Sequence, residues 1–432
     1  MKTIAFHNLG CKVNSYELDV MQQIMREKGY EIVPFDQKAD IYVINTCTVT
    51  GTGDKKSLQA ARRIRREHPG SALVLCGCLA QRMGEALLDT GAVLVLGTQR
   101  RAEIVQLTEQ AVASGRPISA VDPLPEGTPY EPLRAAVQEG HTRAVMKIQE
   151  GCGNRCTYCI IPSVRGPIRS QPPAETALEA RALGEAGFRE IVLTGIHLTS
   201  YGRDLGDHVT LLDAIRAVHD VPGIERIRLG SLEPTIATRE FAASLRALPK
   251  VCPQFHLALQ SGSDTVLQRM ARRYNMRMYR EGAGNLRDVF PDAALTTDIL
   301  TGFPGETEAE FLETCDAIRS IGFSRIHVFP YSRRDGTKAA VLPGQLSRQE
   351  KERRVRQLIA IGEETSRAYR NRWLGREAVV LLEEAREGTF IGYTPEYISV
   401  SVPACDGLES GMPVRVVLTG LTQDGMCGHP AR

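Results

Sequence analysis

Three cysteines stand close together in the middle of the chain, in the segment "GCGNRCTYCIIPSVRG". Cys152, Cys156 and Cys159 form a C-x3-C-x2-C pattern. Three thiolates on one loop can bind three irons of a 4Fe-4S cube and leave the fourth iron without a protein ligand. A small molecule can then chelate the open iron through an amine and a carboxylate. A zinc knuckle is the alternative, but zinc takes four ligands and no fourth cysteine or histidine stands nearby in the sequence.

A second group of cysteines lies near the N-terminus, each after a different predicted strand. Cys11, Cys47 and one of the pair Cys76/Cys78 would meet at one edge of a parallel sheet, again one ligand short of a closed cube. Cys76 continues the apolar strand "ALVLCG", so we expect it in the core. Cys78 follows Gly77 in the loop beyond the strand, so we predict that Cys78 is the ligand. The alternative is that Cys47 and Cys76 are core residues and Cys11 is an exposed thiol.

The composition is that of a globular protein in a reducing compartment. Of 432 residues, 24% are charged and 42% hydrophobic, and the net charge of +2 indicates no partner by itself. No apolar run approaches the roughly 20 residues of a membrane helix, and the N-terminus is polar too soon for a signal peptide. We therefore expect a cytoplasmic protein, in which eleven cysteines serve metal binding, catalysis or packing rather than disulfides.

The elements that must position these cysteines predict an α/β protein of three domains. Residues 1–116 alternate strands and helices, with strands at 2–11, 39–47 and 71–78, which indicates a doubly wound parallel sheet. Residues 117–142 are proline-rich and form a linker.

Residues 143–372 repeat strand and helix six times and predict a partial (β/α)6 barrel. Polar residues follow each strand, where barrel active sites lie. The strands are expected at 144–151, 190–197, 226–234, 254–262, 294–303 and 325–332. The pattern of residues 373–432 indicates five short strands and predicts a small OB-like β-barrel.

The cysteine loop after the first strand of a six-unit barrel resembles the radical S-adenosylmethionine (SAM) superfamily. This resemblance implies that SAM binds the open iron and is cleaved to a radical that removes hydrogen from unactivated carbon. The segments "LTGIH", "GSLEP" and "DILTGFPGET" are similar to the places where that superfamily holds SAM. The SAM contacts so implied are Tyr158, Gly195, His197, Ser231, Glu233, Gln260, Asp298 and Gly302.

Essentially the whole chain resembles the methylthiotransferase family, which has an N-terminal cluster domain, a radical SAM barrel and a C-terminal TRAM domain. The long matches include "GCKVNSYE", "QSGSDTVLQRMARRY" and "TTDILTGFPGETEAEF". The resemblance implies two 4Fe-4S clusters and two uses of SAM, one to methylate a sulfur held at the Cys11, Cys47 and Cys78 cluster and one to supply the radical. "GCKVN" and "NTCTVTGTGDKKS" are most similar to the branch that methylthiolates the position-2 carbon of N6-threonylcarbamoyladenosine beside the tRNA anticodon.

Three alternatives stay open. The same chemistry would suit an isopentenyladenosine tRNA or an aspartate of a ribosomal protein, and a non-catalytic iron–sulfur RNA-binding protein is a further class. The segment from 374 to 432 holds eight acidic residues against four arginines, which would suit a basic protein partner better than RNA. Ala258 also stands where the family usually has proline.

Two basic stretches are candidates for RNA contact. Residues 55–66 hold six basic residues and no acid, and residues 269–280 hold five more together with two tyrosines, a mixture suited to phosphate contact and base stacking. Solvated helix faces are the alternative. The expected RNA contacts are Lys55, Lys56, Arg62, Arg63, Arg66, Arg272 and Arg273. The expected partners are the anticodon stem-loop of tRNA, an external electron donor and a sulfur donor, with the protein as a monomer.

Overall fold

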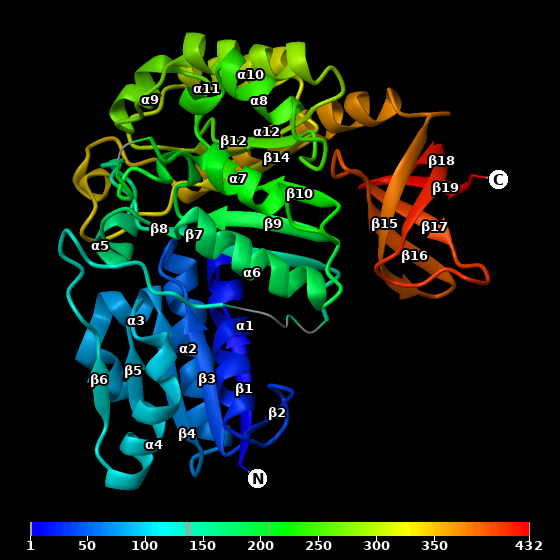
Figure 1. The fold of residues 1–432 in the computed structure, drawn as a ribbon. Coiled ribbons are helices and arrows are strands. Elements are labelled where there is room, and N and C mark those ends of the chain that lie inside the picture. The colour runs from blue at the N-terminus through cyan, green and yellow to red at the C-terminus, as the bar shows by residue number, and fades with distance from the viewer. Residues whose placement is uncertain (1, 135–137, 139, 207, 432) are drawn as a thin grey trace.

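The computed structural model describes residues 2–134, 138, 140–206 and 208–431. Three bodies are visible in Figure 1: an N-terminal α/β domain, a central domain of strands and helices above it, and a small C-terminal β-barrel at its side. The predicted α/β fold class is confirmed. Within the described part of the chain, every helix is too short or too polar to cross a membrane.

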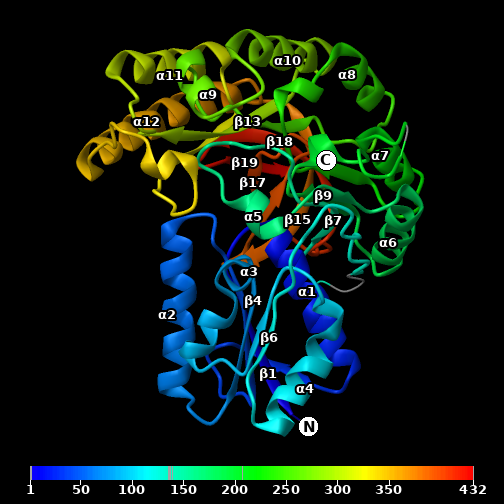
Figure 2. The same ribbon diagram turned by 90° about the vertical axis from the view of Figure 1, so that its left-hand side faces the viewer.

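The N-terminal domain is a six-stranded parallel sheet with helices on both faces. Helices α1 (Lys12–Glu27) and α4 (Ile104–Ser114) pack on one face, and α2 (Gly51–Glu67) and α3 (Cys78–Met83) on the other (Figure 2). The sheet order is β2-β1-β3-β4-β5-β6. Its strands are β1 (Thr3–Asn8), β2 (Glu31–Val33), β3 (Ile41–Thr46), β4 (Ala72–Gly77), β5 (Leu94–Leu96) and β6 (Ile118–Ala120). The three predicted strands are its buried centre, whereas the short β6 lies where we expected linker.

The central domain is the predicted open barrel, built from two sheets. Their orders are β10-β9-β7-β8 and β11-β12-β13-β14. The predicted strand at 226–234 is split at Gly230 into β10 and β11, which belong to different sheets. An added Cβ on Gly230 would lie 3.1 Å from the Leu193 carbonyl oxygen, so the two backbones approach closely there. The strands are β7 (Arg143–Glu150), β8 (Arg169–Ser170), β9 (Glu190–Gly195), β10 (Arg226–Leu229), β11 (Ser231–Leu232), β12 (Gln254–Leu257), β13 (Ala294–Thr301) and β14 (Arg325–Pro330).

Helices cover the outside of the two sheets. They are α6 (Pro173–Glu185), α7 (Leu211–His219), α8 (Arg239–Arg246), α9 (Asp264–Arg269), α10 (Met276–Val289), α11 (Glu308–Ile321) and α12 (Arg348–Asn371). The short helix α5 (Ile161–Arg165) lies instead between the central and N-terminal domains, against α3. Ser347 caps α12, because its hydroxyl accepts the Glu350 N–H at 3.1 Å.

The C-terminal domain is a closed five-stranded barrel, as predicted. Its strands are β15 (Glu377–Arg386), β16 (Thr389–Tyr393), β17 (Ser399–Pro403), β18 (Pro413–Leu421) and β19 (Met426–Pro430), closed in the order β15-β16-β17-β19-β18. Two arginines of β10 attach it to the central domain. Arg226 donates to the Val379 carbonyl at 2.8 Å, and Arg228 donates to the Pro395 carbonyl at 2.9 Å.

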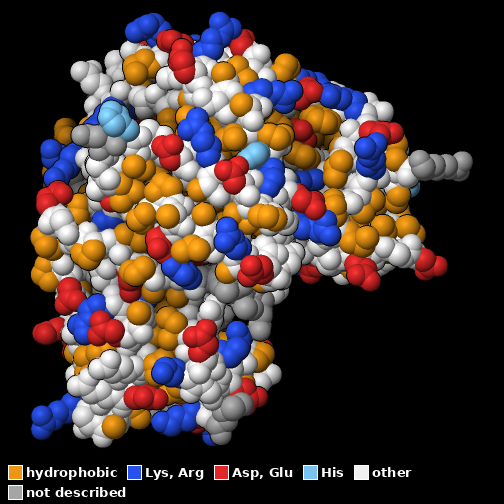
Figure 3. Space-filling view, in the orientation of Figure 1, with side chains coloured by type: hydrophobic (Ala, Val, Ile, Leu, Met, Phe, Trp, Pro, Cys, Tyr) orange, Lys and Arg blue, Asp and Glu red, His pale blue; other side chains and the backbone are white. Residues whose placement is uncertain are grey.

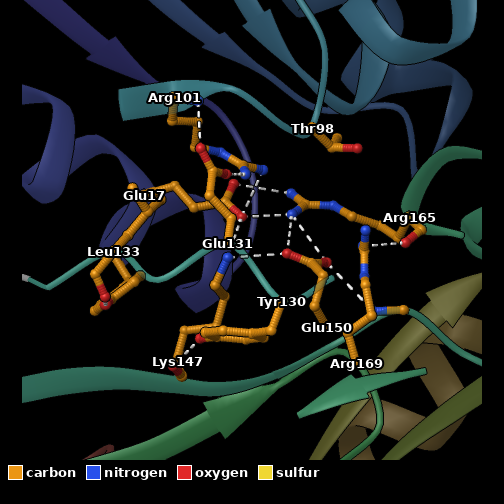
Figure 4. A network of polar contacts seen from close by, with 12 residues as sticks. Glu17, Thr98, Arg101, Tyr130, Glu131, Leu133, Lys147, Glu150, Arg165 and Arg169 are labelled. Atoms are coloured by element: carbon orange, nitrogen blue, oxygen red, sulfur yellow. Dashed lines mark hydrogen bonds and ion pairs between the residues drawn. The ribbon is translucent and has the colours of Figure 1, made fainter. Parts of the chain in front are cut away.

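A buried ion network joins the N-terminal and central domains (Figure 4). The Glu17 carboxylate of α1 contacts Arg101 at 2.8 Å, Lys147 at 3.1 Å and Arg165 at 2.5 Å. Each of these four residues is at most 1% exposed. Burial alone would raise the pKa of Glu17, but the three cations hold it below its ordinary value. Because Lys147 and Arg165 belong to the central domain, the network fixes the two domains against each other.

Replacement of Glu17 by glutamine should destabilise the protein by about 3–5 kcal/mol, because it leaves buried cations without their shared partner. Thermal unfolding measures the loss. Glu27→Gln, at the exposed end of the same helix, is the matched control. The difference from wild type should shrink at acid pH, once the wild-type carboxylate is protonated at its depressed pKa. Equal unfolding midpoints for both variants would contradict a stabilising role for the network.

Candidate active site

A cavity of about 690 Å3 inside the central domain is lined by residues from all three domains. Cys152, Cys156 and Cys159 line it from the loop after β7. Cys11 reaches it from the N-terminal domain, and Tyr397 reaches it from the C-terminal barrel. Cys11 of the N-terminal group and the three cysteines of the barrel loop therefore line one shared space.

The loop after β7 holds its three cysteines in a tight turn. Gly151 has a φ of 72°, and an added Cβ would collide with the Pro167 carbonyl, so only glycine fits there. The Cys152 N–H donates to the Gly166 carbonyl at 3.1 Å, and the Cys159 N–H donates to the Cys156 carbonyl at 3.1 Å. This turn brings all three thiols to the same cavity.

The donor set of this loop fits an iron–sulfur cluster. Thiolates are the ligands that such clusters take, and N–H donors to their sulfurs are part of how proteins tune them. The Asn154 N–H points at the Cys152 sulfur at 3.4 Å, and Arg272 Nη1 donates to the Cys156 sulfur at 3.2 Å. Burial raises the pKa of Cys159 to about 12. Among the described residues, no three His, Cys, Asp or Glu side chains gather around a single metal-ion position.

Seven of the eight residues predicted to contact SAM line the cavity, namely Tyr158, Gly195, His197, Ser231, Glu233, Gln260 and Asp298. Glu233 is the centre of a polar group there, since its carboxylate accepts from Asn154 at 3.0 Å and from Arg272 at 2.7 Å. Gly302 is not among the lining residues. Its N–H donates to the Glu306 carboxylate at 2.5 Å, in the turn after β13.

Arg272 does not lie where the RNA prediction placed it. Its side chain is only 8% exposed and is held between Cys156 and Glu233, so it cannot reach a phosphate on the surface. The prediction treated residues 269–280 as one basic stretch, but α9 ends at Arg269 and α10 begins at Met276. The turn between them directs Arg272 inward, whereas its neighbour Arg273 is exposed.

The three predicted N-terminal ligands each follow one of three neighbouring strands. Cys11 precedes α1, Cys47 follows β3, and Cys78 is the first residue of α3 after β4. The loops touch, because an added Cβ on Gly10 would lie 3.3 Å from the Cys47 Cβ. Burial chiefly raises the pKa of Cys47 and that of Cys78, and the charge of Cys11 acts on both. Cys11 therefore lies near enough to both thiols for its charge to act on them.

Cys76 and Cys78 have different surroundings. Cys76 is in the sheet core as expected, with its thiol 3.6 Å from the Ile44 carbonyl. Cys78 is also buried, at the start of a helix rather than in the expected loop, but a charged group contacts its sulfur. Arg165 Nε donates to Cys78 Sγ at 3.1 Å.

Arg165 connects the ion network to the N-terminal cysteines. Its Nη2 donates to Asn14 Oδ1 at 2.7 Å, and Asn14 in turn donates to the carbonyls of Leu9 and Thr46, each at 3.0 Å. One guanidinium thus touches the Cys78 sulfur and braces the loops of Cys11 and Cys47. Sequence reasoning missed Arg165 and Asn14, although both lie inside the segments that carry the family resemblance, "CIIPSVRG" and "GCKVN".

Comparison with known proteins agrees with this architecture. Residues 3–97 match the model of uncharacterized protein family UPF0004, and residues 146–318 match the radical SAM superfamily. The structure is similar to that of the radical S-adenosylmethionine methyltransferase TsrM from Kitasatospora setae, which was solved with cobalamin and a [4Fe-4S] cluster bound. The TM-score is 0.57 at 16% identity, and the match covers 79% of this chain and 77% of that one. This likeness concerns the fold.

Relatives in sequence are more specific. The threonylcarbamoyladenosine tRNA methylthiotransferase MtaB of Bacillus subtilis is 42% identical over 408 residues, covering 93% of this chain and 90% of that protein. The protein of the same name from Thermotoga maritima is 34% identical and covers 92% and 91%. The chain therefore belongs to the methylthiotransferase family of radical SAM enzymes. The predicted family and transferase class are confirmed, and so are the cofactors, two 4Fe-4S clusters and SAM.

Cys78→Ala should remove about one cluster's iron from the reconstituted protein, whereas Cys76→Ala should leave the iron content unchanged. Both changes remove a buried thiol, so Cys76→Ala controls for the loss of packing at a nearby position. Iron analysis after anaerobic reconstitution measures the outcome. Loss of iron from Cys76→Ala but not from Cys78→Ala would overturn the assignment.

Arg165→Lys should lower the reduction potential of the N-terminal cluster by roughly 20–60 mV. The lost N–H···S bond is worth about 0.5–1.5 kcal/mol, which corresponds to this shift for one electron, and such bonds favour the reduced, more negative cluster. Arg272→Lys is the reciprocal control, since Arg272 makes the matching contact to Cys156. It should lower only the barrel cluster's potential. A redox titration followed by electron paramagnetic resonance separates the two, and an equal shift of both clusters would contradict the assignment.

Proposed function

We propose that this chain methylthiolates the position-2 carbon of N6-threonylcarbamoyladenosine beside the anticodon of tRNA. The observation that carries the proposal is the 42% identity to the Bacillus subtilis protein of that name, which extends over 93% of this chain. Both cysteine groups and the lining of the cavity lie within the architecture of that family. When bound, the two clusters and SAM supply the radical and the methylated sulfur for this reaction.

Different residues of the chain would hold the barrel cluster and SAM. Cys152, Cys156 and Cys159 would bind the cluster that activates SAM, and the polar group around Glu233 would orient SAM itself. His197 is part of this group, with its Nε2 3.3 Å from the Glu233 carboxylate. These contacts would fix the position of SAM, because a hydrogen transfer requires the reacting atoms to be held close and aligned.

The shared cavity accounts for two chemical steps on one base. Cys11 and the barrel cysteines line the same space, so a base held between them can lose hydrogen on one side and receive sulfur from the other. Apolar side chains line part of this space, including Val49, Ile161 and Leu232. An apolar lining limits water and so protects a reactive intermediate from side reactions.

Helix α2 supports the RNA part of the proposal. Lys55, Lys56 and Arg62 are exposed, and within the described residues they make no ion pair, whereas Arg63 and Arg66 pair with Glu67. Elsewhere basic and acidic side chains are interspersed on the face shown in Figure 3, and acidic side chains lie along one edge of the C-terminal barrel. This distribution favours α2 over the C-terminal barrel as the phosphate-binding element.

The remaining parts of the proposal follow from the chemistry. Cleavage of SAM needs an external electron donor, and each methylthio group needs a new sulfur from a sulfur donor. A tRNA substrate places the reaction in the cytoplasm. We propose that the protein acts as a monomer, because each chain supplies both cysteine groups of the cavity.

Mass spectrometry of tRNA nucleosides tests the substrate. Cells that lack this protein should lose the methylthio group from N6-threonylcarbamoyladenosine and keep it on isopentenyladenosine. Wild-type protein should restore the modification, and Cys156→Ala should not. If the threonylcarbamoyl nucleoside keeps its methylthio group, or if a ribosomal-protein aspartate loses its own instead, the substrate assignment fails.

Anaerobic reconstitution separates the enzyme from a non-catalytic iron–sulfur protein. The enzyme should bind about eight irons per chain and cleave SAM. A protein that binds iron but does not cleave SAM would favour the non-catalytic alternative.

A further inference from the structure

The cavity has a second end, away from the cysteine loop, that the chemistry described above does not use. The cluster loop and the polar group around Glu233 follow the carboxyl ends of the barrel strands. Side chains from the opposite half of the strands line the other end, namely Arg228 of β10 and Arg325 and His327 of β14. Lys12 of α1 and Tyr397 of the C-terminal barrel complete it. We refer to these five residues as the cationic end.

Two of the cations near this end already have partners. Arg228 is buried, donates to the Glu190 carboxylate at 2.8 Å and lies 4.6 Å from the Tyr397 ring centroid. Arg143, beside it, pairs with Glu383 and lies 5.1 Å from the same ring. Because each arginine pairs with a glutamate, its charge is largely neutralised. Both arginines help to attach the C-terminal barrel.

Lys12 and Arg325 are different. In the part of the chain that the structure describes, neither makes an ion pair or a side-chain hydrogen bond, although both line the cavity. The nearest acid on β13, Asp298, faces His256 at 3.4 Å. Two positive charges therefore line the cavity, and among the described residues neither is in ion-pair contact with a carboxylate.

Mutual repulsion among the cations supports this view. Burial chiefly lowers the pKa of His327. The carboxylate of Asp298 acts in the opposite direction, and the charges of Arg325, His256 and Lys12 lower the pKa further. Like charges brought together around a cavity produce a positive potential that an anionic ligand would relieve.

Tyr397 belongs to the turn between β16 and β17. Its φ of 65° is a left-handed conformation of the kind that hairpin turns commonly contain, and its N–H donates to the Thr394 carbonyl at 2.9 Å. Its ring stacks on Tyr393 with centroids 4.7 Å apart. The turn presents an aromatic side chain from one domain to a cavity in another, beside the unpaired cations.

We propose that the cationic end binds the carboxylate of the threonylcarbamoyl group, with Lys12 and Arg325 as its partners. The inference rests on the proposed function, since it concerns the same substrate in the same cavity. Threonylcarbamoyl carries one carboxylate, whereas an isopentenyl group or an unmodified adenine carries no charge at this place. A neutral group would leave both cations unpaired, so the cationic end selects the acidic substituent.

The test uses the reconstituted holoenzyme and three anticodon stem-loop RNAs. The first carries N6-threonylcarbamoyladenosine, the second its neutral carboxamide analogue, and the third unmodified adenosine. Wild type should bind the acid about tenfold more tightly than the carboxamide, as expected for a charge-assisted hydrogen bond. Lys12→Met and Arg325→Met should each bring this ratio toward one by weakening only the acid. Lys28→Met, at the opposite end of the same helix as Lys12, should leave the ratio unchanged.

The outcomes separate this inference from the function on which it rests. Because Lys12 adjoins Cys11, iron content is measured for each variant, and Arg325, on a strand of the other domain, gives an independent result. A wild type that modifies the acid RNA but binds acid and carboxamide equally overturns the subsite alone. Variants that weaken all three RNAs equally also overturn it, since they identify phosphate contacts. A wild type that does not modify the acid RNA refutes the proposed function itself.

Discussion

The buried carboxylate of Glu17 is the interaction on which the arrangement of the site depends. It contacts three cations that come from two domains, and all four side chains are buried. Glu131 and Glu150 supply the rest of the negative charge, since they also pair with these cations. A buried ion pair of this kind often stabilises a protein no more than apolar packing would, but it requires a precise arrangement of its partners. It therefore specifies how the N-terminal sheet sits against the barrel.

The same contacts also position the cysteines. Arg165 contacts both Glu17 and the Cys78 sulfur, and the loop of Cys152 begins immediately after β7, which carries Lys147 and Glu150. A shift of one domain against the other would break these contacts and separate the two cysteine groups. The polar network thus aligns two sites that the chain builds independently, each at the carboxyl edge of its own parallel sheet.

Much of this could be predicted because it depends on local patterns. The apolar runs at 39–47 and 71–78 could only be buried strands, and parallel topology then brings Cys11, Cys47 and Cys78 to one edge. The five strands of the C-terminal barrel were equally visible from their spacing. The short strand β6 was not, because three residues carry no periodicity.

What could not be predicted depends on contacts between distant segments. Arg272 was assigned to the surface because its neighbours are basic, yet the turn between α9 and α10 carries it into the site. Arg165 looked like one more arginine after the cysteine loop, and its role follows only from the way α5 packs between two domains. Lys12 and Arg325 are more than 300 residues apart, and no pattern in the sequence places them around one cavity.

The central claim is that both clusters face one cavity across a fixed domain interface. Electron paramagnetic resonance of the fully reconstituted and reduced protein tests it most directly, with Cys78→Ala and Cys156→Ala as references that each hold one cluster. The account predicts magnetic coupling, so the wild-type spectrum should be broadened relative to the sum of the two reference spectra. A wild-type spectrum equal to that sum would show two distant and independent clusters, and would contradict it.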